Sequence, residues 1–375
     1  MLQRVLVAIL LMATVCAAQK AAAVKHVTVY KEPGRFGGWP ANHGIWSWGN
    51  EIVVGFSEGY FKKVESGHAI DRSRPSLPRF ARSLDGGETW KIEVPSFLDA
   101  DSKEKEAVDP PGGFDFTHPD FAITLRMVSS REGYSRFYVS TDRCHSWKGP
   151  YKLPTYGRKV ISARTDYIVN GKHDLMAFIT SGKENGQEGR VFLTRTTDGG
   201  KTWNFVSWIG PEPAGFSIMP SSLRLSPTKI LTTLRQKEGE KHWIDAYLSE
   251  DNGNSWRYLN RPAESTGGFV GNPPGMIKLK DGRLALTYGF RSPPYEIRAR
   301  LSSDNGQTWG EEIALRTNAG CEDLGYPRTV QRADGKIVTL YYISDAKYEE
   351  RYIEATIWDP GKGKGIGSGA SGSQP

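Results

Sequence analysis

Six short polar segments stand at the starts of predicted strands and hold side chains that could do chemistry. The segments are Pro40–His43, Thr117–Asp120, Ala163–Asp166, Ser217–Pro220, Gly271–Pro274 and Gly325–Arg328. Aspartate and histidine can transfer protons, tyrosine can attack a carbon atom, and arginine can neutralise a carboxylate. The candidate side chains are Asn42, His43, His118, Asp120, Arg164, Asp166, Tyr326 and Arg328. Gathered in one concavity, they would form a polar site of the kind that binds a carbohydrate or another small ligand.

An eight-residue box that occurs five times predicts how these segments come together. The first copy, Ser83–Trp90, reads Ser-Leu-Asp-Gly-Gly-Glu-Thr-Trp, and further copies span 140–147, 196–203, 249–256 and 302–309. The copy at 140–147 has lost its glycine. The box aspartates are 53 to 57 residues apart, and a period of this size indicates repeated supersecondary units.

Each position of the box suits a tight hairpin turn. The aspartate can bond the backbone two residues on, the glycine takes a positive φ, and the serine or threonine closes the turn. The tryptophan is expected to pack as an apolar plug between neighbouring units. At about four strands and roughly 50 residues, each unit is one propeller blade. All five box aspartates are therefore structural, and none is a catalytic candidate.

The boxes mark five blades, and the strand-like runs 329–342 and 352–358 supply a sixth. The lone strand His26–Tyr30 is expected to complete that sixth blade, because a closed ring leaves no sheet edge open. The inner strand of each blade should start about 30 to 45 residues before the box, and these starts converge at one mouth of the central channel. We therefore predict an all-β, six-bladed β-propeller with five Asp-box repeats over residues 26–360.

The two ends of the chain lie outside this predicted propeller. Arg4, the apolar run from Val5 to Val15 and the small residues before Gln19 have the layout of a secretory signal peptide, so residues 1–18 are expected to be removed. The mature protein should then be secreted or periplasmic. Residues 361–375 are rich in Gly, Ser and Lys and are expected to form a flexible tail. No later apolar run reaches the roughly 18 residues of a membrane span.

Composition narrows the class of partner. A formal charge of +7 with 11 tryptophans and 16 tyrosines suits an acidic carbohydrate, through electrostatic steering and ring stacking. No dense Lys/Arg run is interleaved with aromatics, so no nucleic acid partner is expected. His43, His68 and His118 form no short ligand motif, and we expect neither a metal nor a cofactor. Because six blades close a ring within one chain, we expect a monomer.

Five boxes of the form Ser-x-Asp-x-Gly-x-Thr-Trp at blade spacing resemble the sialidase (neuraminidase) superfamily of six-bladed propellers. The resemblance covers almost the whole mature chain, although propellers without sialidase activity also carry such boxes. Sialidases hold an aspartate acid on a loop before the first box, and here Gly67–Arg72 puts Asp71 in that place. Their nucleophile is a tyrosine that opens the inner strand of the last blade. The run Gly325–Ile337 matches that strand and makes Tyr326 the counterpart.

The resemblance also implies three arginines that clamp the sialic acid carboxylate through paired hydrogen bonds. Arg235, which follows the strand-like run 230–234, corresponds to the second of them. Arg291 lies within a few residues of the position of the third. The first belongs to an Arg-Ile-Pro motif, where this chain has Pro40–His43 and only Arg35 nearby.

A second departure concerns the glutamate that activates the sialidase tyrosine. It should stand about fifteen residues before Arg235, where this chain has Met219 and Pro220. A tyrosine near its free pKa of about 10 is a poor nucleophile without a base. Asp166 and Asp120, which we expect on adjacent inner strands, are the candidates to replace the glutamate.

The function that the resemblance implies is an exported exo-glycosidase acting on a terminal acidic sugar, sialic acid or a relative. Asp71 would protonate the leaving oxygen and Tyr326 would attack the anomeric carbon. Arg235 and Arg291 would bind the carboxylate of the substrate.

Two alternatives keep the same fold and an acidic glycan or oligosaccharide as the partner. In the first, His43 or His118 acts as a base while Arg164 and Arg328 neutralise a uronic acid. That arrangement would make a polysaccharide lyase or a His-dependent glycosidase on uronate-containing glycans. In the second, the chain is a glycan-binding propeller without catalysis, which has lost the activating glutamate and the first arginine.

Overall fold

Strands make up nearly all of the regular structure. The computed structural model describes residues 19–20, 24–98, 105–129, 133–185 and 187–361. Within these ranges one 3-10 turn, η1 (Pro40–Asn42), is the only helical element, and no helix is long and apolar enough to span a membrane. The expected signal peptide, residues 1–18, and residues 362–375 of the expected tail lie outside the described residues.

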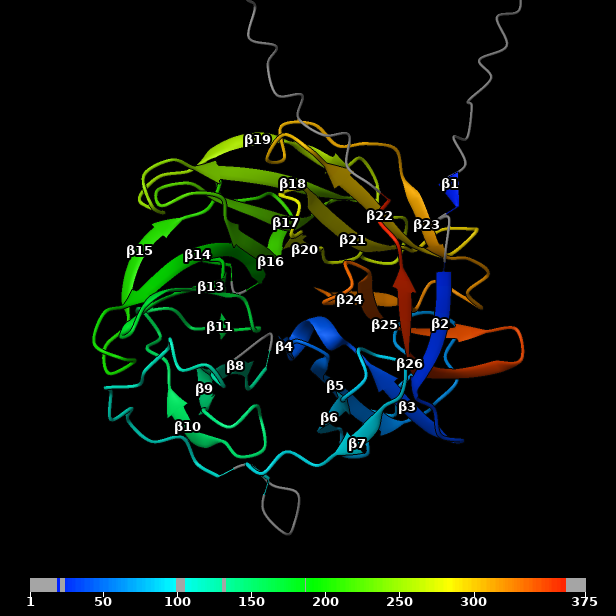
Figure 1. Cartoon of the computed structure of the whole chain (residues 1–375), viewed down its shortest axis with the longest axis horizontal. Helices are drawn as coiled ribbons and strands as arrows, with labels where there is room; N and C mark the ends of the chain where they lie inside the picture. Colours follow the sequence, from blue (N-terminus) through cyan, green and yellow to red (C-terminus); the bar gives the residue numbers. More distant parts are fainter. Residues whose placement is uncertain (1–18, 21–23, 99–104, 130–132, 186, 362–375) are drawn as a thin grey trace, which may run out of the picture.

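The strands form six sheets arranged as blades around a central channel (Figure 1), which confirms the predicted six-bladed propeller. Blade 1 comprises β3 (Arg35–Gly38), β4 (Ile45–Trp48), β5 (Glu51–Tyr60), β6 (Leu77–Ser83) and β7 (Lys91–Glu93). Blade 2 comprises β8 (Ala122–Met127), β9 (Ser135–Ser140) and β10 (Lys148–Lys152). Blade 3 comprises β11 (Ile161–Ser162), β12 (Tyr167–Gly171), β13 (Asp174–Gly182), β14 (Glu188–Thr196) and β15 (Asn204–Trp208).

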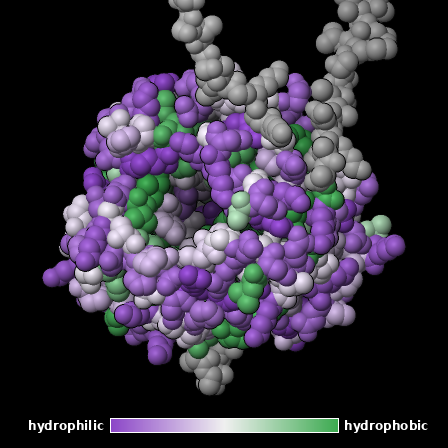
Figure 2. Space-filling view, in the orientation of Figure 1, coloured by the Kyte–Doolittle hydropathy of each residue, from purple (hydrophilic) through white to green (hydrophobic). Residues whose placement is uncertain are grey.

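The other half of the ring follows in chain order. Blade 4 comprises β16 (Phe216–Arg224), β17 (Ile230–Glu238), β18 (Lys241–Ser249) and β19 (Arg257–Ala263). Blade 5 comprises β20 (Gly275–Lys278), β21 (Leu284–Phe290), β22 (Glu296–Ser302) and β23 (Ile313–Arg316), with β1 (Gln19–Lys20) parallel to β23. Blade 6 comprises β24 (Gly325–Gln331), β25 (Ile337–Asp345), β26 (Tyr348–Trp358) and β2 (Val24–Tyr30). The face seen in Figure 2 is mostly polar and is hollowed near the middle of the ring.

The N-terminal strand closes the ring, as expected from the sequence. β2 pairs antiparallel with β26, from Val24 opposite Trp358 to Tyr30 opposite Ile353. The Tyr30 ring then packs on Phe56 of blade 1, with ring centroids 5.0 Å apart. Blade 6 is therefore built from both ends of the chain, and its packing on blade 1 completes the circle.

The apolar core is divided among the interfaces between blades. The buried described residues form six clusters, and each lies mainly between two neighbouring blades. Box tryptophans take part in them: Trp147 packs on a phenylalanine of blade 1, Trp203 on one of blade 2 and Trp256 on one of blade 3. The expected role of the tryptophan as a plug between units is confirmed.

The box aspartates hold the turns together. Asp85 accepts hydrogen bonds from Ser83 Oγ (2.8 Å), Thr89 N (2.9 Å) and Thr89 Oγ1 (2.6 Å), and Trp90 Nε1 donates to Gly87 O (3.0 Å). The three bonds to the aspartate recur in the other four boxes, at Asp142, Asp198, Asp251 and Asp304. Their structural role is therefore confirmed.

Blade 2 departs from the predicted register. Its innermost described strand, β8, begins beside the box turn, with Ala122 opposite Ser140, and runs toward the channel mouth. The expectation that Thr117–Asp120 opens an inner strand at the mouth is wrong. Asp115 instead binds Thr117 N and Oγ1 in a turn, so this segment lies at the box end of the blade.

Replacing Asp85 with alanine should lower the free energy of unfolding by about 1 to 3 kcal/mol at pH 7, because the donors of the turn lose a charged acceptor. Burial raises the pKa of Asp85, but the hydrogen bonds from Thr89, Ser83 and Glu88 outweigh it and lower the pKa to about 2. A carboxylate with a depressed pKa stabilises the fold above its unfolded pKa, and this contribution is lost as the pH falls toward 2. Urea unfolding should therefore show a larger deficit at pH 7 than at pH 3.

The matched control is Asp109→Ala, because the Asp109 side chain is 92% exposed and lies 3.6 Å from Lys152. It should change the stability little. A deficit for Asp85→Ala no larger than that of the control would contradict the structural role of the box.

Candidate active site

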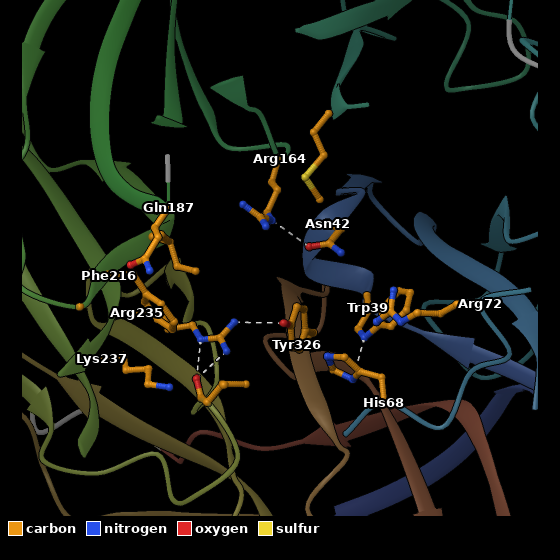
Figure 3. Close-up of a pocket in the computed structure, with 14 residues that line it drawn as sticks. Trp39, Asn42, His68, Arg72, Arg164, Gln187, Phe216, Arg235, Lys237 and Tyr326 are labelled. Carbon is orange, nitrogen blue, oxygen red and sulfur yellow. Dashed lines mark hydrogen bonds between the residues drawn. The ribbon is translucent and has the colours of Figure 1, made fainter. Parts of the chain in front are cut away.

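A pocket of about 830 Å³ opens at the mouth of the central channel. Every blade or its connecting loop contributes to the lining. One lining residue from each blade or its loop is, in chain order, Trp39, Met127, Arg164, Phe216, Val270 and Tyr326. Figure 3 shows Tyr326 near the middle of this set, with its hydroxyl directed toward Arg235.

The lining of the pocket is strongly cationic. Arg72, Arg164, Arg235 and Lys237 contribute to it, and no aspartate or glutamate is among the described residues that line it. Low-dielectric walls with charges of one sign raise the local concentration of ligands of the opposite sign. The pocket therefore favours an anionic ligand.

Tyr326 and Arg235 form the central polar contact. Arg235 Nη1 donates to Tyr326 Oη at 3.0 Å, and both side chains are buried. Burial raises the pKa of Tyr326, but the positive charges of Arg235, Arg291 and Arg164 outweigh it, so the pKa lies below its ordinary value. The phenolate form is thus favoured here more than in water.

A strained loop holds the two arginines behind Tyr326. Val270 O accepts from Arg235 Nε (3.1 Å) and Nη2 (2.5 Å), and Phe269 O accepts from Arg291 Nη1 (3.1 Å). Phe269 and Val270 have φ angles of 44° and 55°, which are unfavourable for bulky and β-branched residues and cost on the order of 1 to 3 kcal/mol each. The buried arginine contacts offset this cost. The hydrogen bonds to Val270 O therefore hold the guanidinium of Arg235 beside Tyr326.

Met219 stands where the resemblance places an activating glutamate. Its Sδ lies 3.4 Å from Arg235 Nη1. On this side Tyr326 therefore has an arginine and a thioether as neighbours, and no carboxylate takes the position of the glutamate.

His68 enters the pocket wall with a buried carboxylate behind it. His68 Nδ1 lies 2.6 Å from Asp323 Oδ1, and Asp323 is fully buried. Asp323 also accepts from Tyr342 Oη (2.6 Å), Arg351 Nε (3.0 Å) and Ala69 N (3.0 Å). Figure 3 shows the His68 ring beside Tyr326, on the side away from Arg235.

The structure brings four of the residues singled out in the sequence into this pocket: Tyr326, Arg235, Arg164 and Asn42. Arg164 Nε donates to Asn42 Oδ1 at 3.1 Å, which joins blade 3 to η1. Arg291 lies behind the pocket, 1% exposed, and donates to Leu324 O, Phe269 O and Tyr342 Oη. Arg291 does not line the pocket. Its guanidinium nitrogens are bonded to the surrounding backbone and to Tyr342.

Asp166 and Arg328 lie in a second cavity of about 320 Å³, further along the channel. The carboxylate of Asp166 accepts from Ser222 N (3.1 Å) and Oγ (2.7 Å), and burial raises its pKa to about 7. Arg328 Nη2 donates to Ala41 O and Thr165 O, both at 2.6 Å. Neither residue lines the pocket of Tyr326, so Asp166 does not stand in for the missing glutamate beside it.

The remaining candidates lie elsewhere. His43 is buried between Ser57 Oγ (2.9 Å) and Arg126 Nη1 (3.1 Å), and burial together with Arg126 and Arg328 holds its pKa well below the ordinary value. His118 accepts from Asp120 N (3.2 Å) in the turn before β8. Asp120 accepts from Arg143 Nε (2.6 Å) in the box turn of blade 2. Asp71 binds Ser73 N (3.0 Å) and Oγ (2.6 Å) in its own loop and does not line the pocket.

Sequence reasoning missed several residues of the pocket. His68, Trp39, Gln187 and Lys237 line it, and Asp323 supports His68 from behind. Two signals were available. His68 belongs to the Gly67–Arg72 run that drew attention to Asp71, and Asp323 stands just before Tyr326 in the chain. Among the described residues, no group of three or more His, Cys, Asp or Glu side chains is arranged to hold a metal ion.

Comparison with known proteins places the chain among repeat propellers. Residues 121–339 match the family described as the BNR repeat-like domain. No curated protein matches the sequence. A solved protein of unknown function from Dyadobacter fermentans superposes with a TM-score of 0.69 at 21% identity, over 90% of this chain and 99% of that one.

Two glycosidase structures share the fold at lower identity. The Trypanosoma rangeli sialidase in complex with the inhibitor DANA gives a TM-score of 0.61 at 13% identity, over 90% of this chain and 60% of the sialidase chain. The chain thus spans 60% of the length of that enzyme chain. The Penicillium chrysogenum alpha-L-arabinanase complexed with arabinobiose gives 0.57 at 12% identity, over 89% of this chain and 97% of that one.

Replacing Arg235 with glutamine should raise the pKa of Tyr326, because the phenolate loses its nearest positive charge. The absorbance of phenolate, measured as the difference between a protein and its Tyr326→Phe partner across pH, isolates this one tyrosine. In the wild type it should titrate below about 10, and in the Arg235→Gln background at higher pH.

The control is Arg257→Gln, whose side chain is 53% exposed beside Glu250 and should leave this titration unchanged. A Tyr326 component that titrates at or above the ordinary tyrosine pKa in the wild type would rule out the proposed effect of the arginines.

Proposed function

Because the chain belongs to the family of BNR repeat-like domains and folds as a sialidase-like six-bladed propeller, we propose that it hydrolyses the glycosidic bond of a terminal acidic sugar. The reaction takes place in the pocket at the channel mouth, with Tyr326 as the nucleophile. Residues 1–18 have the layout of a signal peptide, so the proposal includes export of the enzyme.

One observation carries the proposal: Arg235 donates to Tyr326 Oη in a pocket with four cationic side chains and, among its described lining residues, no carboxylate. A nucleophile must be activated by a base or by a lowered pKa, and here the neighbouring positive charges serve the second route. A tyrosine is also suited to an acidic substrate, because the neutral phenol does not repel the carboxylate of the sugar during binding. Sialidases with a tyrosine nucleophile are an established variation on glycoside hydrolysis with two carboxylates.

The cations that bind the acid differ from the set that the resemblance implied. Arg291 is committed to backbone carbonyls, so it supports the fold of the site. We propose that Arg164, Arg72 and Lys237, which line the pocket around Tyr326, bind the carboxylate of the substrate. This set offers charge from three directions where the family motif offers paired arginine donors, which favours an acidic sugar without requiring sialic acid itself.

The Tyr326→Phe variant should lose turnover of a fluorogenic glycoside of an acidic sugar, because the attacking oxygen is gone while the ring and its packing remain. Arg235→Gln should lower kcat by about 10²- to 10³-fold, the usual cost of removing a donor to a charged reacting oxygen. Release of the fluorescent aglycone from sialic acid and uronic acid glycosides measures both.

Tyr258→Phe is the matched control, since Tyr258 lies on the outer strand β19 and is 52% exposed. It should keep wild-type turnover. Turnover that survives in Tyr326→Phe, or equal turnover of an uncharged glycoside, would refute the proposal.

A second candidate is β-elimination from a uronate-containing glycan. It is favoured by the absence of carboxylates from the described lining, because elimination needs a base that removes the proton beside the sugar carboxylate and cations that neutralise that carboxylate. Tyr326 or His68 would take the proton, the glycosidic C–O bond would break as a C=C bond forms, and the other of the two would give a proton to the departing oxygen. His43 and His118, the bases expected from the sequence, do not line this pocket.

An ultraviolet-absorbing unsaturated product distinguishes the two reactions. Elimination predicts that absorbance from polyuronate substrates grows with wild-type enzyme and is lost in Tyr326→Phe. Hydrolysis predicts a reducing sugar without such absorbance.

A further inference from the structure

Neither His68 nor Asp323 was among the site residues predicted from the sequence, yet the two form a close pair beside the pocket. Asp323, in the loop before β24, is 0% exposed and gathers four donors around its two oxygens. A buried carboxylate with this many partners is ionised. Burial raises its pKa, but His68, Arg351 and Arg291 outweigh burial and hold the pKa well below the ordinary value.

The short contact fixes the tautomer of His68. An ionised carboxylate can only accept, so the proton of the neutral imidazole lies on Nδ1, toward Asp323 Oδ1 at 2.6 Å. Trp39 Nε1 and Tyr342 Oη also lie 3.3 Å from Nδ1. The bond to the charged carboxylate is shorter and stronger, so it determines that Nδ1 carries the proton. Nε2 therefore keeps its lone pair on the pocket side of the ring.

The surroundings of His68 suit a group that gains and loses a proton. Burial lowers its pKa, Asp323 raises it, and the positive charges of Arg291 and Arg235 lower it again, with a net pKa below the ordinary value. The groups packed around the ring are Trp39, Phe269, Tyr326 and Tyr342. These rings shield part of the imidazole, whose side chain is 16% exposed at the pocket, while Asp323 stabilises the imidazolium that forms when Nε2 takes a proton.

We propose that His68, oriented by Asp323, is the acid and base of this pocket, in the role that the resemblance assigns to Asp71. The inference rests on the proposed hydrolytic function and deepens it. The cycle starts once Tyr326 has ionised beside Arg235 and Nε2 of His68 carries a proton. The neighbouring arginines favour the phenolate, while Nε2 gives its proton to the departing oxygen and regains one from water.

The steps balance. In the first, a bond forms between Tyr326 Oη and the anomeric carbon, the glycosidic C–O bond breaks, and the departing oxygen takes the proton from Nε2. In the second, a water oxygen bonds to the anomeric carbon and its proton goes to Nε2. As this bond forms, the bond to Tyr326 breaks, and its electron pair stays on the phenolate beside Arg235.

The test compares two glycosides of the same acidic sugar, one with an aryl leaving group and one with an alkyl alcohol. An aryl oxide leaves without a proton, whereas an alkoxide needs one. His68→Gln should lower kcat on the alkyl glycoside by about 10²- to 10⁴-fold and on the aryl glycoside far less. The glutamine amide can still donate to Asp323, so the buried network keeps a partner.

Asp71→Asn tests the competing acid, and Asp323→Asn tests the positioning role. Loss of the Asp323 charge should move the limb of the pH–rate profile that reports His68 to lower pH, an effect that a merely structural residue would not produce. Circular dichroism and thermal unfolding establish that each variant is folded.

Each outcome decides the question. Selective loss on the alkyl glycoside in His68→Gln supports the inference. Equal loss on both glycosides, or a leaving-group dependence that appears in Asp71→Asn instead, overturns the inference while the hydrolase function stands. No turnover of either glycoside by the folded wild type overturns the proposed function and this inference together.

Discussion

Closure of the ring by β2 and β26 is the constraint on which the rest of the structure depends. The pocket has no element of its own, because its wall is assembled from short pieces of all six blades and their loops. The relative positions of Tyr326, Arg235 and Arg164 are therefore set by the packing of whole sheets. A propeller can keep such a mouth in place because each sheet is held by an apolar cluster on both sides.

The site keeps two positively charged arginines buried close to Tyr326. Arg235 and Arg291 are buried arginines, and each donates to backbone carbonyls. The ionised Asp323 acts on Arg291 without a direct hydrogen bond, and a carboxylate bonded to either guanidinium would weaken the positive field at Tyr326 further. Holding the arginines with Phe269 and Val270 preserves that field, at the expense of two left-handed backbone positions. The strain in this loop and the lowered pKa of Tyr326 are thus two consequences of one arrangement.

The fold was predictable because its signal is local. Each Asp box specifies its turn through bonds within eight residues, so the spacing of the boxes alone indicated five blades. The strand-like runs after the last box then indicated the sixth. The site was predictable only in part. Tyr326 and Arg235 stand in strands whose neighbours fix their register, but Asp120 was misplaced because blade 2 uses a turn where an inner strand was expected. The pairing of His68 with Asp323 joins residues that are 255 positions apart in the sequence, and a local sequence pattern cannot predict such a contact.

The direction in which the box tryptophans pack has a consequence for the order in which the chain can fold. Trp147, Trp203 and Trp256 each contact an aromatic ring of the preceding blade, so during synthesis every new blade meets a surface that is already made. Blade 1 differs, because Gly87 of its box adjoins Val338 of β25, which belongs to the last blade to be completed. A nascent chain can therefore add blades 2 to 5 one after another while one flank of blade 1 stays uncovered. The apolar side chains of that flank stay exposed until the final blade packs on them.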